Sequence, residues 1–184
     1  MSQREPTFDE LLAAARHSAV HLEMRDSYGV GDETADFERW RRTGVRDVDP
    51  SSAYWAPWVE LIRETVARGV SVRRARVVSE PVTEYIRYEH AGTSVNIQAG
   101  EQVRWLPRRL ASDIPLPGND CWVFDGEIVL FNHFTGDGSW SEPGWELREE
   151  PSVAGMATVA FDTVWARGVP HEAYSVAPVE HGES

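Results

Sequence analysis

The sequence contains no lysine, since all 18 of its basic residues are arginines. Chemistry that needs an ammonium group is therefore excluded: Schiff-base catalysis, Walker-type phosphate loops and a lysine general base. There is one cysteine, Cys121, which excludes an internal disulfide framework and any multi-cysteine zinc or iron–sulfur site. We expect Cys121 to lie in a buried strand and to be inert. The Gly-x-Ser-x-Gly pattern is also absent, so no serine lies in a nucleophile elbow.

Long apolar runs are missing too, so we expect no membrane association. The polar start, Met1 to Asp9, does not have the basic and apolar segments of a signal peptide. These features predict a cytoplasmic protein. Its 184 residues, of which 41 % are hydrophobic, predict one globular domain with a sizeable core.

The formal net charge of −12 is unevenly distributed along the chain. Residues 68–109 hold 8 arginines and 4 acids, whereas residues 110–184 hold 2 arginines and 13 acids. Affinity for nucleic acid comes from neutralising phosphates, so this acidic chain predicts no direct nucleic-acid binding. The central basic segment could bind a small anion, or its arginines could pair with the acidic ends.

Apolar residues that recur at spacings of three and four predict five helices, and shorter apolar runs predict strands. The helices are expected at residues 8–17, 34–42, 55–68, 82–91 and 153–166. The strands are expected from residue 21, at 70–78 and at 102–106. Gly92 should end the fourth helix, and residues 135–144 should form a loop.

The strongest local signal is Asp125-Gly126 between the apolar runs 121–124 and 127–131, which predicts an antiparallel hairpin. Together the elements predict an α/β fold with a single small mixed sheet of about four strands, flanked by helices. We expect one domain over residues 1–174, followed by a flexible tail, 175–184. The domain would comprise an N-terminal helix and strand extension (1–53), a core (54–138), and a loop with a C-terminal helix (139–174).

A dense polar cluster follows the hairpin: Asn132-His133 and then Gly136-Asp137-Gly138. A histidine where a strand meets a loop is a common catalytic placement. His133 with Asp125 or Asp137 could form an acid–base pair, or His133 could bond only to the backbone. We expect no cofactor and no metal, because His17 and His21, although four residues apart, belong to different predicted elements.

Arg74 and Arg76 share a side-chain direction on the strand 70–78, because alternate residues of a strand face the same side. A buried, unpaired guanidinium is very costly, so each needs a partner. Neighbouring carboxylates could supply it. Alternatively, Arg74 or Arg76 could hold an anionic ligand together with Arg104 of the next strand and Asn132 and His133 of the hairpin.

Eight tryptophans are far more than average usage. Most of them have core-like spacing: Trp40, Trp55, Trp58, Trp122 and Trp165. The others lie in polar, loop-like surroundings: Trp105, Trp140 and Trp145. Exposed aromatic residues would indicate a binding interface.

Three segments resemble an uncharacterised actinobacterial family classed as a domain of unknown function: SVRRARVVSEPVTEYIRYEH (71–90), VRWLPRR (103–109) and LPGNDCWVFDGEIVLFNHFTGDG (116–138). The segment HLEMRDSYGV (21–30) is similar to its N-terminal part, so the resemblance covers most of the chain. It implies a cytoplasmic setting and an accessory role beside a helix-turn-helix regulator. It implies no established activity.

A fainter resemblance is to the phospholipase D-like half-domain, carried by ARGVSVRRARVV and CWVFDGEIVLFNH. The catalytic pattern of that family is His-x-Lys-x4-Asp-x6-Gly-Ser. With its Asp aligned on Asp125, Gly118 and Asp120 occupy the His and Lys positions, and Asn132-His133 occupies the Gly-Ser position. The resemblance therefore implies the fold of such a half-domain without phosphodiesterase activity.

These observations favour a non-enzymatic accessory or regulatory protein that binds a protein partner, such as a helix-turn-helix regulator, or a small anionic ligand. The alternative is a small enzyme that uses His133 with Asp125 or Asp137 on an anionic substrate. An enzyme would need His133, a carboxylate and a positive group to converge in one pocket. A binding module would instead expose a tryptophan-rich surface.

Overall fold

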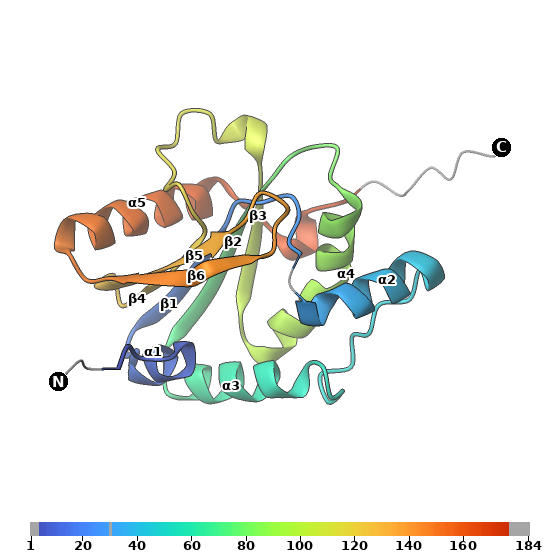
Figure 1. The fold of residues 1–184 in the computed structure, drawn as a ribbon, viewed down its shortest axis with the longest axis horizontal. Helices are drawn as coiled ribbons and strands as arrows, with labels where there is room; N and C mark the ends of the chain where they lie inside the picture. The colour runs from blue at the N-terminus through green and yellow to red at the C-terminus, as the bar shows by residue number, and fades with distance from the viewer. Residues whose placement is uncertain (1–3, 30, 177–184) are drawn as a thin grey trace.

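Seven strands of the described residues form one open, mixed sheet in the order β6-β5-β4-β1-β2-β3-β7. The computed structural model describes residues 4–29 and 31–176 (Figure 1). The strands are β1 Ser18–Glu23, β2 Ser71–Val78, β3 Gln102–Pro107, β4 Cys121–Phe124, β5 Ile128–Phe134, β6 Trp140–Arg148 and β7 Val169–Pro170. β1, β2 and β3 run parallel, and the other neighbouring pairs are antiparallel. The predicted α/β class with a single mixed sheet is confirmed, with more strands than expected.

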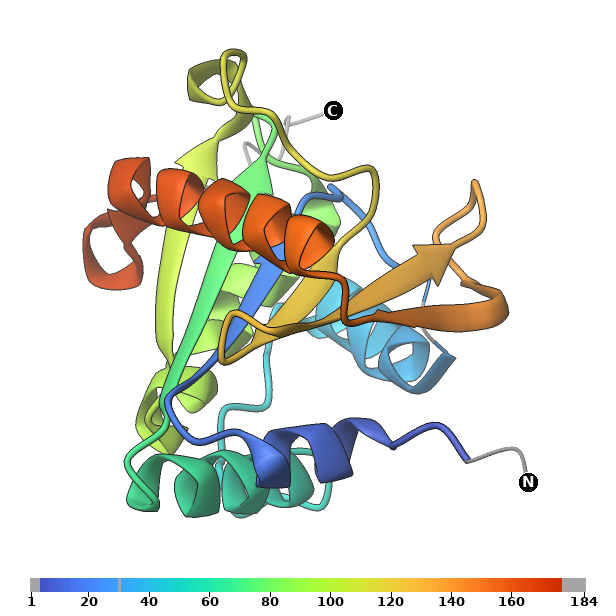
Figure 2. The same ribbon diagram turned by 90° about the vertical axis from the view of Figure 1, so that its left-hand side faces the viewer.

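Helices cover both faces of this sheet (Figures 1 and 2). They are α1 Phe8–Ala14, α2 Gly31–Thr43, α3 Ala56–Ala67, α4 Glu84–Ala99 and α5 Pro151–Arg167, with short 3₁₀ turns at Arg108–Leu110 and His171–Ala173. α5 lies on one face, and α1, α3 and α4 lie on the other, with α2 beside α4. None of the helices between residues 4 and 176 that the structure describes is long and apolar enough to cross a membrane.

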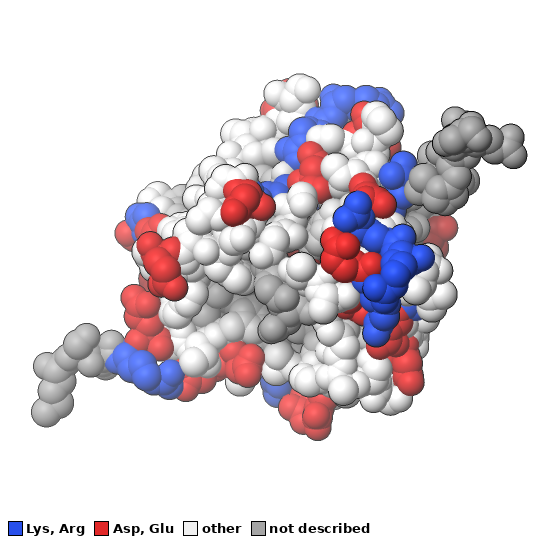
Figure 3. All heavy atoms as spheres, turned by 45° about the vertical axis from the view of Figure 1, so that its right-hand side comes forward, with Lys and Arg blue, Asp and Glu red and all other residues white. Residues whose placement is uncertain are grey.

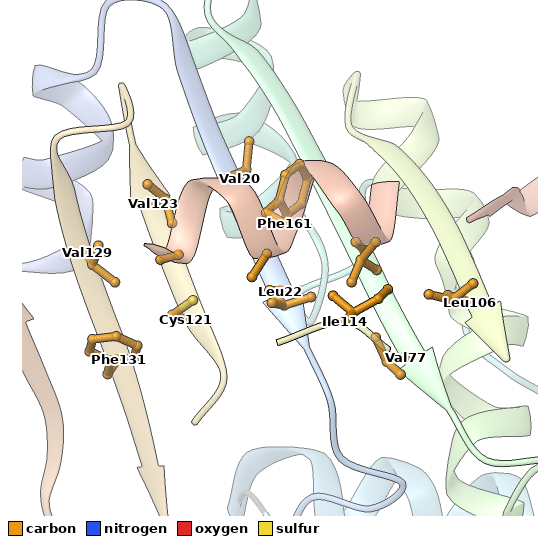
Figure 4. Close-up of a cluster of buried hydrophobic side chains, with 14 of the residues drawn as sticks. Val20, Leu22, Val77, Leu106, Ile114, Cys121, Val123, Val129, Phe131 and Phe161 are labelled. Atoms are coloured by element: carbon orange, nitrogen blue, oxygen red, sulfur yellow. The ribbon is translucent and has the colours of Figure 1, made fainter. Parts of the chain in front are cut away.

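The face under α5 holds an apolar core (Figure 4). Phe161 of α5 packs there among side chains of several strands, including Val20, Leu22, Val77 and Val123. These strand residues alternate with others that point to the opposite face. The face under α5 is thus mainly a packed apolar core, whereas the opposite face combines apolar clusters with the buried charges of Arg74 and Arg76.

The predicted hairpin is confirmed, since β4 pairs with β5 from Cys121↔Phe131 to Phe124↔Ile128. Both residues of its turn have positive φ, 53° for Asp125 and 72° for Gly126, which is the conformation that an Asp-Gly pair tolerates well. Cys121 is buried, and burial raises the pKa of its thiol to about 12. A thiol with so high a pKa is a poor nucleophile, as expected from the sequence.

Two local predictions are wrong. α4 does not end at Gly92 but continues to Ala99, and its C-terminal cap is Gly100, with φ 108°. Gly92 lies at a close contact instead, because a Cβ there would lie 3.0 Å from Nε of Arg46. Residues 140–144, expected in a loop, begin the strand β6 at the edge of the sheet, where its Pro143 can be accommodated.

The N-terminal strand also differs from its expected place. β1 was expected in an extension to the core, but it lies between β2 and β4 in the middle of the sheet. This position sets Glu23 beside Arg76, and His21 between Arg74 on one side and Trp122 on the other. This arrangement determines which charged and aromatic side chains meet on the sheet face opposite α5.

Candidate functional site

A cavity of about 620 Å³ lies on the sheet face opposite α5. Its walls are rich in aromatic side chains, contributed by α1, α3, the segment before α3, and the strands β4 and β6. These are Phe8, Tyr54, Trp55, Trp58, Trp122, Trp140 and Trp145. The volume and the lining of this cavity are typical of binding sites for small organic molecules, because such sites are mostly apolar and have a few polar groups.

The aromatic walls differ in exposure. Trp122 is buried on the sheet, and Phe8 of α1 packs against it edge to face at 5.0 Å between ring centroids. Trp140 and Trp145 of β6 are 49 % and 36 % exposed, which places them at the rim. A binding module was expected to expose tryptophans. Here two tryptophans of the edge strand β6 are exposed beside the cavity.

Arg74 and Arg76 on β2 line the floor of the cavity and contact three carboxylates, of which that of Glu89 also lines it. Arg74 donates from Nε to Glu101 at 2.7 Å and from Nη1 to Glu23 at 2.6 Å. Nε of Arg76 lies 2.6 Å from Glu23, and its Nη2 lies 2.5 Å from Glu89. Burial by itself would raise the pKa of Glu23, but the two arginines lower it to about 2. Protein carboxylates therefore supply the partners that these arginines need.

His21 of β1 faces the cavity and is 7 % exposed. Its ring stacks on Trp122 with 4.3 Å between centroids, and its Nδ1 lies 3.5 Å from Glu23. Neither ring nitrogen makes a hydrogen bond to any of the described residues. Burial lowers the pKa of His21 to about 3, so the ring is neutral and carries one donor and one acceptor.

The buried neutral state of His21 predicts a pH effect on stability. The unfolded chain takes up a proton at this histidine below about pH 6.5, whereas the folded chain does so only near pH 3, so stability falls as the pH decreases between these values. In His21→Phe this loss of up to about 1.4 kcal/mol per pH unit should be absent. Urea unfolding at pH 7, 6, 5 and 4 measures it. Parallel losses in both proteins would contradict the prediction.

The wall near α2 combines Arg46 and Glu33. Arg46 forms an ion pair with Asp36, and its guanidinium lies 3.9 Å from the ring centroid of Tyr88 and 5.1 Å from that of Trp55. Glu33 accepts a hydrogen bond from the Tyr85 hydroxyl. Burial, and after it the charge of Glu89, raises the pKa of Glu33 to about 7.

Arg74, Arg76 and Asn132, three of the residues expected to bind an anion, line the cavity. Arg104 does not, and its predicted place beside them is wrong. It pairs with Ala75 across β2 and β3, so it faces the α5 side, whereas Arg74 and Arg76 face the other. There it donates to the carbonyl oxygen of Trp165 at 2.8 Å, and its guanidinium lies over that ring.

The residues of the predicted acid–base pair are not brought together. His133 alternates with Asn132 along β5, does not line the cavity, and has its Nε2 3.6 Å from Glu146. Asp125 lies in the turn at the other end of β5 and accepts backbone N–H groups of residues 16, 17 and 18. Asp137 accepts from Thr135 and Ser139 within its own loop. Both aspartates thus hold local backbone structure.

Several residues of the site, in the cavity lining or in contact with it, were not identified from the sequence. His21 shows only the alternation of a strand, and Glu101 follows a glycine outside any motif. Trp55, Trp58 and Trp122 were assigned to the core, although they line the cavity. Trp105, expected in polar surroundings, is fully buried, with Arg76 over its ring at 5.0 Å. The surplus of tryptophans was the one signal in the sequence that pointed to an aromatic site.

The family model described as Domain of unknown function (DUF6879) matches residues 6–176. No curated protein matches the chain. Among solved structures, it is similar to Nuc from Salmonella typhimurium, a phospholipase D family member, with TM-score 0.51 and 13 % identity over 88 % of this chain and 86 % of that one. TrmBL2, an archaeal chromatin protein, matches with TM-score 0.46 and 13 % identity over 87 % of this chain and 47 % of that one. At such low identity the likeness to Nuc concerns the fold, and it confirms the phospholipase D-like layout expected from the sequence.

Proposed function

This chain belongs to the family described as Domain of unknown function (DUF6879), and we propose that it is a non-enzymatic module that binds a small organic molecule in the aromatic cavity. The observation that carries the proposal is the pairing of aromatic walls with unpartnered polar atoms at the floor. Both nitrogens of His21 and Nη1 of Arg76 are buried and make no hydrogen bond to the described part of the chain. A bound molecule with a flat apolar body and a polar end would satisfy both features.

The state of the titratable groups supports binding rather than catalysis. The His21 imidazole is neutral, but a pKa near 3 makes it a weak base at neutral pH. His133, Asp125 and Asp137 occupy separate places, as described above. On the face drawn in Figure 3, basic side chains lie beside acidic ones, which favours mutual pairing over an extended surface for nucleic acid.

The first test is binding of a neutral aromatic probe, 4-phenylbenzyl alcohol, measured by calorimetry. Trp140→Ala should weaken binding by about tenfold, since an aromatic contact contributes roughly 0.5–1.5 kcal/mol. Met156→Ala is a matched control, because it removes an exposed apolar side chain from α5 on the opposite face. Equal affinity of all three proteins, or no binding at all, would overturn the proposal.

The second test concerns the phospholipase D-like fold. We expect no turnover of an aryl phosphodiester, because the position of the catalytic lysine holds Asp120. Asp120 accepts hydrogen bonds from the Tyr28 hydroxyl and from the backbone N–H of Met24, and burial raises its pKa to about 6. It has neither the charge nor the freedom to bind phosphate. Turnover clearly above that of a His133→Ala control would contradict this expectation.

The wider role in this proposal is that of an accessory or regulatory protein in the cytoplasm, with a protein partner such as a helix-turn-helix regulator. The half-exposed Trp140 at the cavity rim supports it, since a partner could contact the rim and sense whether the cavity is occupied. Affinity purification of the full chain from its host, with and without Trp140→Ala, tests this role. Loss of a stoichiometric partner in the variant is the expected result.

A further inference from the structure

We infer that the molecule bound in the cavity carries a positively charged nitrogen, which binds against Glu33 and Glu89. The inference rests on the proposed function and names the chemical class of the ligand. It differs from the expectation of an anionic ligand, which came from the arginines of β2.

The guanidinium groups at the cavity are already neutralised by the protein. Arg74 and Arg76 together contact three carboxylates, those of Glu23, Glu89 and Glu101. This cluster therefore contains one carboxylate more than it has guanidinium groups. A bound anion would have to displace a buried carboxylate and leave that charge without a partner, which is very costly.

A fourth carboxylate, that of Glu33, adds to this excess of negative charge. Glu33 lines the cavity, and no arginine among residues 4–29 and 31–176 forms an ion pair with it. The groups that act on it are Tyr85 and Glu89 of α4, Arg76 of β2 and Glu23 of β1. Two of these four are themselves carboxylates. Proximity to Glu89 and burial both disfavour the ionised form of Glu33, so a cation placed between the two carboxylates would relieve this repulsion.

The aromatic walls of the cavity also favour a positively charged ligand. Guanidinium groups already lie over several of these rings: Arg46 over Tyr54, at 5.3 Å, and over Trp55, and Arg74 over Trp58, at 5.6 Å. The walls thus have the geometry in which aromatic faces attract cations. His21 contributes one nitrogen that can accept a hydrogen bond from an ammonium group. Carboxylates, aromatic faces and a neutral imidazole together select a protonated amine on an aromatic body.

The test compares three probes with one biphenyl body: 4-phenylbenzylamine, 4-phenylbenzyl alcohol and biphenyl-4-carboxylate. Calorimetry at pH 7 should give the amine at least tenfold tighter binding than the alcohol, and the carboxylate the weakest. Glu33→Gln keeps an acceptor for Tyr85 and should remove the advantage of the amine over the alcohol. Glu38→Gln, an exposed acid on the same helix, is the matched control and should bind all three probes like the wild type.

A second measurement does not depend on a variant. A cation at Glu33 favours its ionised form, so binding of the amine at pH 6.5 should release protons, which calorimetry in two buffers of different ionisation enthalpy detects. Equal affinity for amine and alcohol, a preference for the carboxylate, or amine binding without proton release would overturn the inference and leave the proposed function standing. Failure of all three probes to bind would overturn both.

Discussion

Replacement of Phe161 by alanine is expected to lower the free energy of unfolding by about 3–5 kcal/mol, the usual cost of truncating a buried phenylalanine. Phe161 is 1 % exposed and lies at the centre of the core between α5 and the sheet (Figure 4). Its ring stacks on Trp165 at 5.7 Å, and the guanidinium of Arg73 lies 5.0 Å from its centroid. The neighbouring strand residues belong to a closely packed sheet, so they cannot move in to fill the space.

Val159→Ala is the matched control for this experiment. Val159 lies on the same helix but is 62 % exposed, so its truncation should change the free energy of unfolding by less than about 0.5 kcal/mol. Chemical denaturation of both variants measures the difference. A loss below about 1 kcal/mol in Phe161→Ala would show that the face under α5 is not the tightly packed core described here.

Glu101→Gln should destabilise the protein by about 3–5 kcal/mol, because it removes one partner of a buried ion pair. Glu101 is 1 % exposed, contacts Nε of Arg74 at 2.7 Å and accepts from Nδ2 of Asn96 at 2.8 Å. After the substitution the only carboxylate of the described residues in contact with Arg74 is that of Glu23, which also contacts Arg76. Denaturation at pH 7 measures the loss.

Two further proteins make this result interpretable. Glu127→Gln removes an exposed acid from the hairpin turn and should leave stability unchanged within about 0.5 kcal/mol. The double variant Glu101→Leu with Arg74→Leu should be more stable than Glu101→Gln, since removal of both partners leaves no buried charge unpaired. A double variant less stable than the single one would mean that Arg74 acts mainly through its contacts with Glu23 and Trp58.

Local chemistry by itself determined several parts of this protein. The Asp125-Gly126 turn followed from the tolerance of these residues for positive φ, and its hairpin is found as predicted. The apolar spacing of residues 55–68 correctly predicted α3, and that of residues 153–166 predicted α5. Such features depend on neighbours within a few residues, so a single sequence contains the information. The absence of lysine likewise excludes whole classes of chemistry in any fold.

The site depended on contacts between distant parts of the chain. Side-chain alternation correctly indicated that Arg74 and Arg76 share a face, and the cost of a buried guanidinium required partners for them, but not which ones. The insertion of β1 between β2 and β4 brought Glu23 to these arginines and stacked His21 on Trp122. Strand order and register are fixed by burial across the whole sheet, which no short segment of sequence encodes. For the same reason the sequence wrongly predicts a helix end at Gly92, because only the packed structure shows that the side chain of Arg46 lies against it.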